Sequence, residues 1–306
     1  MVYHDKKVTY PDGTTDYDYY CVEAIPCVIV NQVSDLDRFD DKRLTGRLEA
    51  TLITEQPLLI GSGEVEVEGG DNGVQRLQFA RLASGSRLVI PGSSLKGAIR
   101  TYAEALSPSC RAVTDNCRRC PACTIFGSTD HQGRLCFADS VLGQGVATQK
   151  IRIVQRRGPK RECRGRKFYY FEYPKHTPGS QMEEVEVIPK DVRIVCTATF
   201  LNLTKWELGL ILLAMGLGHN GVVKPFSLKL GGGRNRRLGR VRFLPETVKI
   251  ECRTRYLEEL VEKSKSAAKE HSREDLISAY IEWASKYCTA IAAIADKFQR
   301  GAPDGA

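Results

Sequence analysis

Four cysteines lie within fourteen positions of the chain, in "SCRAVTDNCRRCPACTIFGS" (residues 109–128). They are Cys110, Cys117, Cys120 and Cys123, with the spacing C-x6-C-x2-C-x2-C. Four thiolates complete the tetrahedral coordination of Zn²⁺ and leave no open position, which is typical of a structural site. A metal held in this way contributes on the order of 10 kcal/mol to folding, which suits a tight turn without an apolar core. We therefore predict a zinc knuckle over residues 108–128.

Two other interpretations of the four cysteines stay open. They could be unrelated thiols, or they could hold an iron–sulfur cluster, although the C-x2-C-x2-C-x3-C run of such clusters lacks its fourth cysteine here. His131 could also replace one cysteine as a ligand. Arg118 and Arg119 lie between the ligands, and we expect the knuckle to direct them at phosphate.

The stretch "IPGSSLKGAIRTYAEALS" (90–107) carries the signals of a helix start. Pro91 and Gly92 break the preceding extended run, and we expect Ser93 or Ser94 to cap the helix. Amide groups at a helix start bind anions, aided by the helix dipole. Lys96 and Arg100 follow one turn apart and add positive charge. An ordinary capped surface helix with solvated charges is the alternative.

A basic run and an aromatic run follow one another over residues 150–173. Residues 150–167, "KIRIVQRRGPKRECRGRK", hold nine basic residues and one acid. Clustered positive charge attracts phosphates, and aromatic rings can stack on bases. The five aromatics that follow cannot all face solvent, so we expect some of them in the core: Phe168, Tyr169, Tyr170, Phe171 and Tyr173. A solvated charged loop is the alternative for the basic run.

The segment "GGGRNRR" (231–237) combines glycines with Arg234, Arg236 and Arg237. Glycines let a backbone approach a ligand closely, and the arginines supply donors, although a simple tight turn fits the pattern too. Across the 306 residues, Lys and Arg number 45 against 37 acids, a formal net charge of +8. This surplus favours polyanionic partners only weakly.

The periodicity of the remaining segments predicts the elements that position these residues. We expect strands over 46–63, 133–142, 191–203 and up to 243, and helices over 90–107 and 204–218. The order strand, helix, strand, long insertion, strand, helix, strand predicts an α+β fold with a ferredoxin-like core and both helices on one face of the sheet.

The other segments are expected to be less regular. Residues 64–89 are predicted as a long loop, 167–189 as a β-hairpin that turns at 174–179, and 254–299 as one or two helices. We divide the chain into a leader (1–44, of which only 21–33 is expected to form a strand), a core (45–250) and a C-terminal helical segment (251–306).

The composition excludes an evident membrane protein. The longest apolar run, 208–218, is about half of the ~20 residues that span a bilayer. The first residues are polar and do not resemble a signal peptide, and the eleven cysteines are odd in number. We expect a cytoplasmic protein with mostly reduced thiols and no membrane partner.

Five motifs together resemble a known family. "PLLIGSG", "IPGSSLKGAIR", "CPACTIFGS", "GRLCFADS" and "GGGRNRRLGRVRF" come in the order seen in the RAMP superfamily of CRISPR-associated proteins. Over about 45–245 the chain resembles a Cas7-type backbone subunit of a type III effector complex, of the III-D kind. The resemblance implies an RRM-like core that grips guide RNA and a hairpin thumb, here the insertion at 145–190. It also implies a structural zinc at the cysteine cluster, and target RNA and other Cas subunits as partners.

The resemblance assigns roles to the basic residues described above. The resemblance supports RNA contact at the helix start and in the glycine-rich loop, and clustered charge favours it in the basic run. The predicted RNA-binding residues are Ser93, Ser94, Lys96, Arg100, Arg156, Arg157, Lys160, Arg161, Arg234, Arg236 and Arg237.

Target-RNA cleavage stays open at this stage. Cleaving members of the family use a loop aspartate and a divalent metal, which would be Mg²⁺ or Mn²⁺ here, and a carboxylate near the scissile phosphate is what such chemistry requires. The only aspartate between the first strand and IPGSSLKG is Asp71 in "EGGDNGV", whereas Arg76 occupies the expected place. A turn-forming Asp-Asn-Gly is the alternative. Asp139 in "CFADS" is expected to cap or to pair.

Some RAMP proteins belong to a different functional class, the metal-independent guide-processing endoribonucleases with a histidine as general base. His219, beside Asn220, is the only histidine in a suitable loop. The cysteine cluster and the long insertion argue against this alternative.

Overall fold

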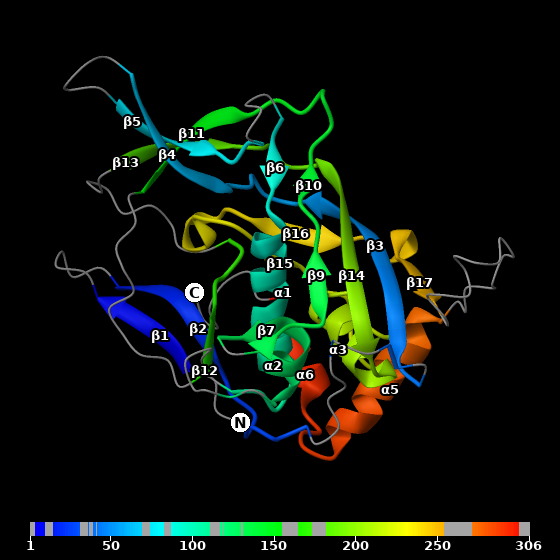
Figure 1. The fold of residues 1–306 in the computed structure, drawn as a ribbon. Coiled ribbons are helices and arrows are strands. Elements are labelled where there is room, and N and C mark those ends of the chain that lie inside the picture. Colours follow the sequence, from blue (N-terminus) through cyan, green and yellow to red (C-terminus); the bar gives the residue numbers. More distant parts are fainter. Residues whose placement is uncertain are drawn as a thin grey trace, which may run out of the picture.

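The computed structural model describes most of the chain. The described residues are 4–9, 15–30, 36, 39–40, 42–68, 74–82, 87–110, 117, 119–129, 131–154, 165–172, 182–253 and 271–299. Within them the fold is mixed α/β with antiparallel sheets (Figure 1).

The largest sheet runs through the middle of the molecule, and its strands pair antiparallel in the order β15-β16-β3-β14-β9. Its two long strands, β3 and β14, alternate buried and exposed side chains, so the sheet has one core face. A sixth strand, β17, pairs with β3 beyond β16. The strands are β3 (Leu44–Thr54), β9 (Leu135–Phe137), β14 (Arg193–Leu203), β15 (Leu228–Lys229), β16 (Arg240–Phe243) and β17 (Lys249–Arg253).

Four helices form the layer on the core side. Helix α1 (Gly92–Leu106) contacts α3 (Lys205–Ala214), and α3 in turn packs against α5 (Arg273–Ser285). Because α3 is enclosed on all sides from Glu207 onward, it is apolar all round rather than amphipathic. Helix α6 (Ile291–Lys297) lies against α1. The helices expected over 90–107 and 204–218 are therefore present, and two helices lie within 254–299.

A second sheet has the strand order β11-β13-β5-β4 and lies above the first in Figure 1. Two predictions are wrong here. Residues 64–89 hold strands rather than only a loop, and β13 pairs with β11 rather than with the start of a 167–189 hairpin. Non-local pairing decides both outcomes, since a short strand is stabilised by its neighbours. The strands are β4 (Gly61–Glu68), β5 (Val74–Phe79), β11 (Gln149–Val154) and β13 (Met182–Val187).

A third sheet contains β1 (His4–Thr9), β2 (Thr15–Glu23) and β12 (Gly165–Phe168). Residues 1–44 are thus more regular than expected, and the strand lies at 15–23 rather than over 21–33. Tyr20 of β2 packs on Phe168, with ring centroids 5.9 Å apart, and on Tyr170 at 5.1 Å. These aromatic partners lie far away in sequence, which is why local patterning does not reveal the strand.

Short elements complete the described chain: β6 (Val89–Ile90), α2 (Pro121–Phe126), β7 (Gly127–Ser128), β8 (His131–Gln132), β10 (Ser140–Val141), and the 3₁₀ turns η2 (Arg234–Arg236) and η3 (Pro245–Thr247). In the described part of the chain, no helix is long and apolar enough to cross a bilayer.

Candidate metal centre and nucleic-acid interface

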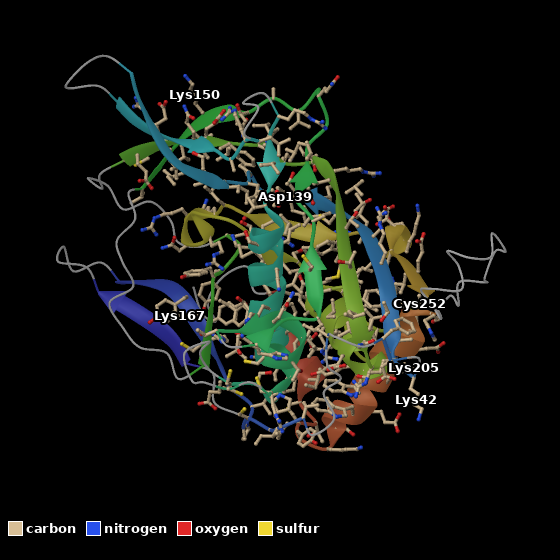
Figure 2. The ribbon with its side chains drawn as sticks, in the orientation of Figure 1. Lys42, Asp139, Lys150, Lys167, Lys205 and Cys252 are labelled. Atoms are coloured by element: carbon tan, nitrogen blue, oxygen red, sulfur yellow. The ribbon has the colours of Figure 1, made fainter. Side chains whose placement is uncertain are left out.

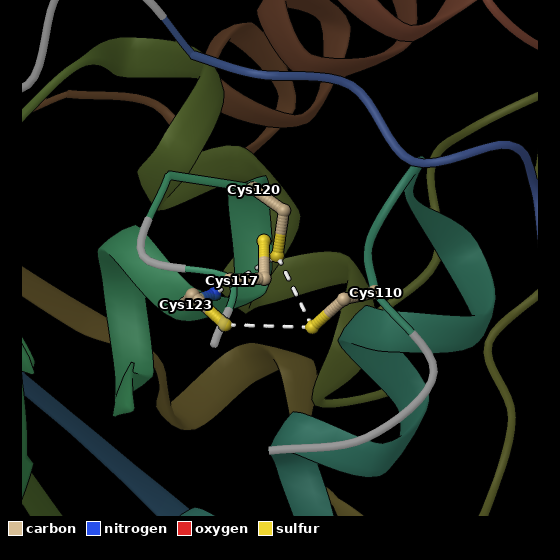
Figure 3. Close-up of side chains that lie close together, drawn as sticks. All are labelled: Cys110, Cys117, Cys120 and Cys123. Carbon is tan, nitrogen blue, oxygen red and sulfur yellow. Dashed lines mark hydrogen bonds between the residues drawn. The ribbon is translucent and has the colours of Figure 1, made fainter. Parts of the chain in front are cut away.

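The four clustered cysteines converge on one point (Figure 3). Their sulfur atoms all lie within 4.8 Å of one another. The Sγ of Cys110 is 3.5 Å from that of Cys123 and 3.7 Å from that of Cys120. A tetrahedron with Zn–S bonds of ~2.3 Å has edges of about 3.8 Å. The cluster can therefore hold one metal ion such as zinc. Among the described residues this group contains only cysteines, and His131 is not part of it.

Local sequence explains how the cysteines meet. Helix α2 begins at Pro121, whose missing N–H is no loss at a helix start. The Sγ of Cys120 accepts a hydrogen bond from the amide of Cys123 at 3.4 Å. Gly127 then ends α2 with a φ of 92°, a conformation that favours glycine. The second half of the cluster is thus a tight turn stabilised at both ends.

Electrostatics of the cluster favour a cation. Hydrogen bonding by the Cys123 thiol lowers the pKa of Cys120 to about 4, despite burial. Burial, followed by the charge of Cys120, raises the pKa of Cys110 to about 12. One thiolate therefore opposes the ionisation of the next, and a divalent cation would remove this opposition.

Arg100 lies beside the cysteines. Its guanidinium donates to Glu104 Oε1 at 2.8 Å, to the carbonyl of Gly127 at 2.7 Å and to Cys123 Sγ at 3.6 Å. Glu104 also forms an ion pair with Arg166 of β12. The pKa of Arg100 is raised: burial opposes the rise, and the bond to Glu104 outweighs it. Arg100 thus braces the cluster, and the RNA contact expected of it stays a prediction.

The start of α1 is built differently from the prediction. The helix begins at Gly92, and neither Ser93 nor Ser94 caps it. Asp139, which follows the short strand β9 by two residues and is labelled in Figure 2, accepts the Gly92 N–H at 2.8 Å instead. The expectation that Asp139 caps or pairs is confirmed. Because a Cβ on Gly92 would lie 2.0 Å from the carbonyl oxygen of Phe137, only glycine fits this approach.

Pro91, directly before the first turn of α1, lines a cavity. Ser93 is exposed and Lys96 half-buried, and burial lowers the pKa of the Lys96 ammonium. A cavity of about 640 Å³ adjoins this turn, and it is lined by Pro91 and Asp139 together with residues of the second sheet such as Ser62 and Gln78.

The glycine- and arginine-rich loop is held in place by hydrogen bonds at its start. Gly232 donates to the carbonyl of Leu59 at 2.8 Å, and buried Lys229 donates to Gln56 Oε1 at 2.9 Å and to the carbonyl of Leu238 at 3.0 Å. Burial lowers the pKa of Lys229 to about 7, with smaller effects from neighbouring arginines. These contacts fix the backbone of the loop against the two large sheets.

The three arginines of this loop differ in their surroundings. Arg234 lies over the ring of Tyr169, 5.7 Å from its centroid, and Arg236 donates to the carbonyl of Val154 at 3.1 Å. Arg237 is exposed, with a φ of 60°. Tyr169 is half-buried, whereas three of its neighbours belong to the core, as expected for part of that run: Phe168, Tyr170 and Phe171.

Five predicted site residues lie outside the described residues. Asp71 falls in the connection between β4 and β5, and the basic residues fall between β11 and β12: Arg156, Arg157, Lys160 and Arg161. The structure therefore does not bear on them.

His219, the candidate general base, faces the protein. Its Nε2 shares a hydrogen bond of 2.8 Å with Ser278 Oγ of α5, and its Nδ1 is buried. A base for RNA processing has to reach a ribose hydroxyl. The arrangement suits a link between a loop and α5 better than catalysis.

Sequence reasoning missed several residues of the site. The contact of Tyr169 with Arg234 and the buried Lys229 depend on packing between distant segments. The hydrogen bond from Gly92 to Asp139 had only a weak local signal, since Asp139 lies between the short strands β9 and β10.

Comparisons with known proteins point to one family. A search of curated proteins finds no match. A solved structure described as "Cryo-EM structure of the Type III-B Cmr-beta bound to cognate target RNA" contains a similar chain, with 16% identity and a TM-score of 0.40. The similarity covers 68% of this chain and 61% of that chain, so the protein spans less than two thirds of its relative. A model of the RAMP superfamily matches residues 51–242, which include α1, the cysteine cluster, the glycine-rich loop and the strands β9, β14 and β15 of the central sheet. The chain belongs to the RAMP superfamily.

Proposed function

We propose that this protein is a guide-RNA-binding backbone subunit, of the Cas7 type, in a type III CRISPR ribonucleoprotein, where it positions target RNA for antiviral interference. One observation carries the proposal. The match to the RAMP superfamily spans both basic elements, the start of α1 and the loop at 231–237.

The core of this proposal is a ferredoxin-like, RRM-like domain. The elements β3, α1, β9, β14, α3 and β16 follow one another along the chain, and their strands are ordered β16-β3-β14-β9 in space. If these four strands are numbered along the chain, their order in the sheet is 4-1-3-2, and all neighbours pair antiparallel. This is the strand order of a ferredoxin-like sheet. Such a sheet holds the first helix start and the loop before the last strand in fixed places, which supports RNA contact by both.

Two surfaces would grip the RNA backbone. At the start of α1, Ser93 and Ser94 offer hydroxyls, and Lys96 offers charge beside the amides of the first turn. In the loop, Arg237 is the exposed arginine, and Arg234 lies on Tyr169. The loop and α1 are near neighbours, since β15, which leads into the loop, contacts α1. Phosphate contacts of this kind bind RNA with little regard for sequence.

The other parts take supporting roles in the same proposal. Zinc at the cysteine cluster would be structural, and residues 145–190 would form the thumb, with β11 and β13 as its described base. Further copies and other Cas subunits would be the protein partners. If the subunit also cuts target RNA, Asp71 with Mg²⁺ or Mn²⁺ is the candidate.

The salt dependence of RNA binding tests the proposal. Binding of a guide RNA to the purified protein should weaken linearly on a log–log plot against salt, because phosphate contacts release counterions. Replacing Lys96 and Arg237 together with glutamine should lower the slope by roughly 0.7 for each lost contact on a single strand. Guides of different sequence should be affected alike.

Lys205→Gln is the matched control. This lysine is exposed at the start of α3, well away from Asp139 and the start of α1 (Figure 2). Its replacement should leave the slope unchanged. An equal loss in the control, or binding that does not respond to salt, would contradict the proposed grip.

A further inference from the structure

A fifth cysteine approaches the metal centre from a distant part of the sequence. The segment after β2, drawn as a blue tube in Figure 3, runs past the cysteine cluster. The amide of Val28 donates to the carbonyl of Pro108 at 3.0 Å, and the amide of Val30 donates to the carbonyl of Arg119 at 2.8 Å. Pro108 precedes Cys110 by two residues, and Arg119 lies between Cys117 and Cys120. These two bonds hold Cys27 against the cluster.

The thiol of Cys27 interacts with the cluster directly. It forms a hydrogen bond with the thiol of Cys117 and lies close enough to Cys120 and Cys110 to be influenced by their charges. The residue is nevertheless exposed, and its other contact is a weak one to the carbonyl of Val28 at 3.9 Å.

The four members of the original cluster are not equivalent. Cys110, Cys120 and Cys123 are buried, with exposed fractions of 6%, 0% and 0%, and the Cys110 sulfur contacts the other two. Cys117 is half-buried, and it is the member that contacts Cys27. Three thiols are therefore enclosed, whereas Cys117 and Cys27 are more accessible, and Cys27 lies outside the group of four whose sulfur atoms are all within 4.8 Å of one another.

We propose that Cys27 is a fifth thiol of the metal centre and exchanges with Cys117 as the fourth ligand. In the exchange one metal–sulfur bond breaks and another forms. Cys27 gives up its proton on binding, and the released Cys117 thiolate takes up one, so no electrons are transferred. The inference rests on the proposed metal at this cluster.

The exchange has a structural consequence. Segment 24–30 continues directly from β2. This strand pairs with β12, which lies at the end of the basic run at 150–167. When Cys27 binds, the metal links this three-stranded sheet to α1 and α2. When Cys117 binds, the two backbone hydrogen bonds of Val28 and Val30 hold the segment alone.

Zinc affinity of the full-length protein tests the proposal. Affinity is measured against a competing chelator for Cys27→Ser, Cys117→Ser, the double variant, and Cys136→Ser as an exposed-cysteine control. Each single variant should keep one zinc, with affinity reduced by less than about tenfold. The double variant should lose more than about a hundredfold, because only three thiolates remain; loss of an outer-shell partner alone costs 10–100-fold. If Cys117→Ser weakens zinc as much as the double variant does, Cys27 is not a ligand.

Alkylation of the zinc-loaded protein gives a second readout that does not depend on metal affinity. Mass spectrometry after iodoacetamide treatment should find Cys27 and Cys117 each partly labelled and the other three cluster cysteines protected. In Cys117→Ser, Cys27 should become protected. If Cys27 is labelled as fast as Cys136 in the wild type and in Cys117→Ser, the inference is overturned.

The outcomes separate this inference from the proposed function. A wild-type protein that binds no zinc would overturn the inference and the metal centre, while the salt-dependent RNA binding would stand. Loss of RNA binding in a zinc-loaded protein would overturn the proposed function and leave the fifth ligand intact.

Discussion

Two glycines of α1 show how a single side chain decides the geometry at the start of this helix. A Cβ on Gly92 would meet the carbonyl of Phe137 at 2.0 Å, whereas a Cβ on Gly97 would meet nothing within 4 Å. Gly92→Ala should lower the free energy of unfolding by about 1–3 kcal/mol through overpacking. Gly97→Ala, its matched control, should raise it by up to about 1 kcal/mol, because alanine favours the helix. Denaturant unfolding measures both, and equal effects would contradict this role of Gly92.

Asp71 allows a prediction about catalysis at the same scale. If it supports metal-dependent cleavage, Asp71→Ala in the assembled complex should abolish one product of target-RNA cleavage and leave target binding intact, since a carboxylate near phosphate adds no affinity. The products are resolved by gel electrophoresis with Mg²⁺ present. An unchanged ladder would mean that this subunit only grips and spaces the RNA.

At the scale of elements, Glu186 of β13 joins the second sheet to the segment before α1. It accepts hydrogen bonds from Arg81 at 2.5 Å, Thr148 at 2.6 Å and the amide of Phe79 at 2.7 Å. Burial alone would raise its pKa, but these bonds lower it from 4.5 to about 2. Because the pKa of Glu186 is lower in the folded than in the unfolded protein, its carboxylate stabilises the fold fully at pH values above the unfolded pKa of 4.5. This contribution is lost as the pH falls from 4.5 through about 2.

Comparison with Glu186→Gln isolates this contribution. At pH 7 wild type should exceed the variant by about 1–2 kcal/mol in the free energy of unfolding, since solvent screens part of the interaction, and the difference should shrink as the pH approaches 2. Glu282→Gln, an exposed position on α5, is the control and should show little difference at any pH. A wild-type advantage over Glu186→Gln that stays constant from pH 6 to pH 2 would contradict the account.

Removing the metal should loosen the zinc knuckle at 108–128. A chelator should increase hydrogen exchange in α2 and in the segment 24–30, because Cys120 and Cys123 lie at the start of α2 and the segment is hydrogen-bonded beside the ligands. The central strands β3 and β14 should exchange as before. Equal protection of α2 with and without metal would show that the cluster folds on its own.

Local signals explain which elements could be predicted. Helices α1 and α3 and strand β14 have strong periodicity or capping residues, and each was found near its observed range. Strands β4 and β12 were missed, because one is rich in glutamate and glycine and the other pairs with a segment more than a hundred residues away. The four cysteines were found together because they are close in sequence, whereas Cys27 reaches them only through the fold.

At the scale of the whole molecule, a folded core holds the two basic elements that, in the proposed function, bind one polyanion. The central sheet fixes the start of α1 through Asp139 and fixes the loop at 231–237 through Lys229 and Leu59. The C-terminal helices lie at the opposite end of α1 from its first turn (Figure 1). RNA should therefore contact one end of the molecule and leave α5 exposed.

A crosslinking map tests this claim most directly. Guide RNA is photocrosslinked to the protein, and the modified peptides are identified by mass spectrometry. The account predicts crosslinks within residues 90–100 and 231–240, and in the basic run at 150–167. Crosslinks confined to α5 and α6, or none above the level of an unrelated acidic protein, would contradict it.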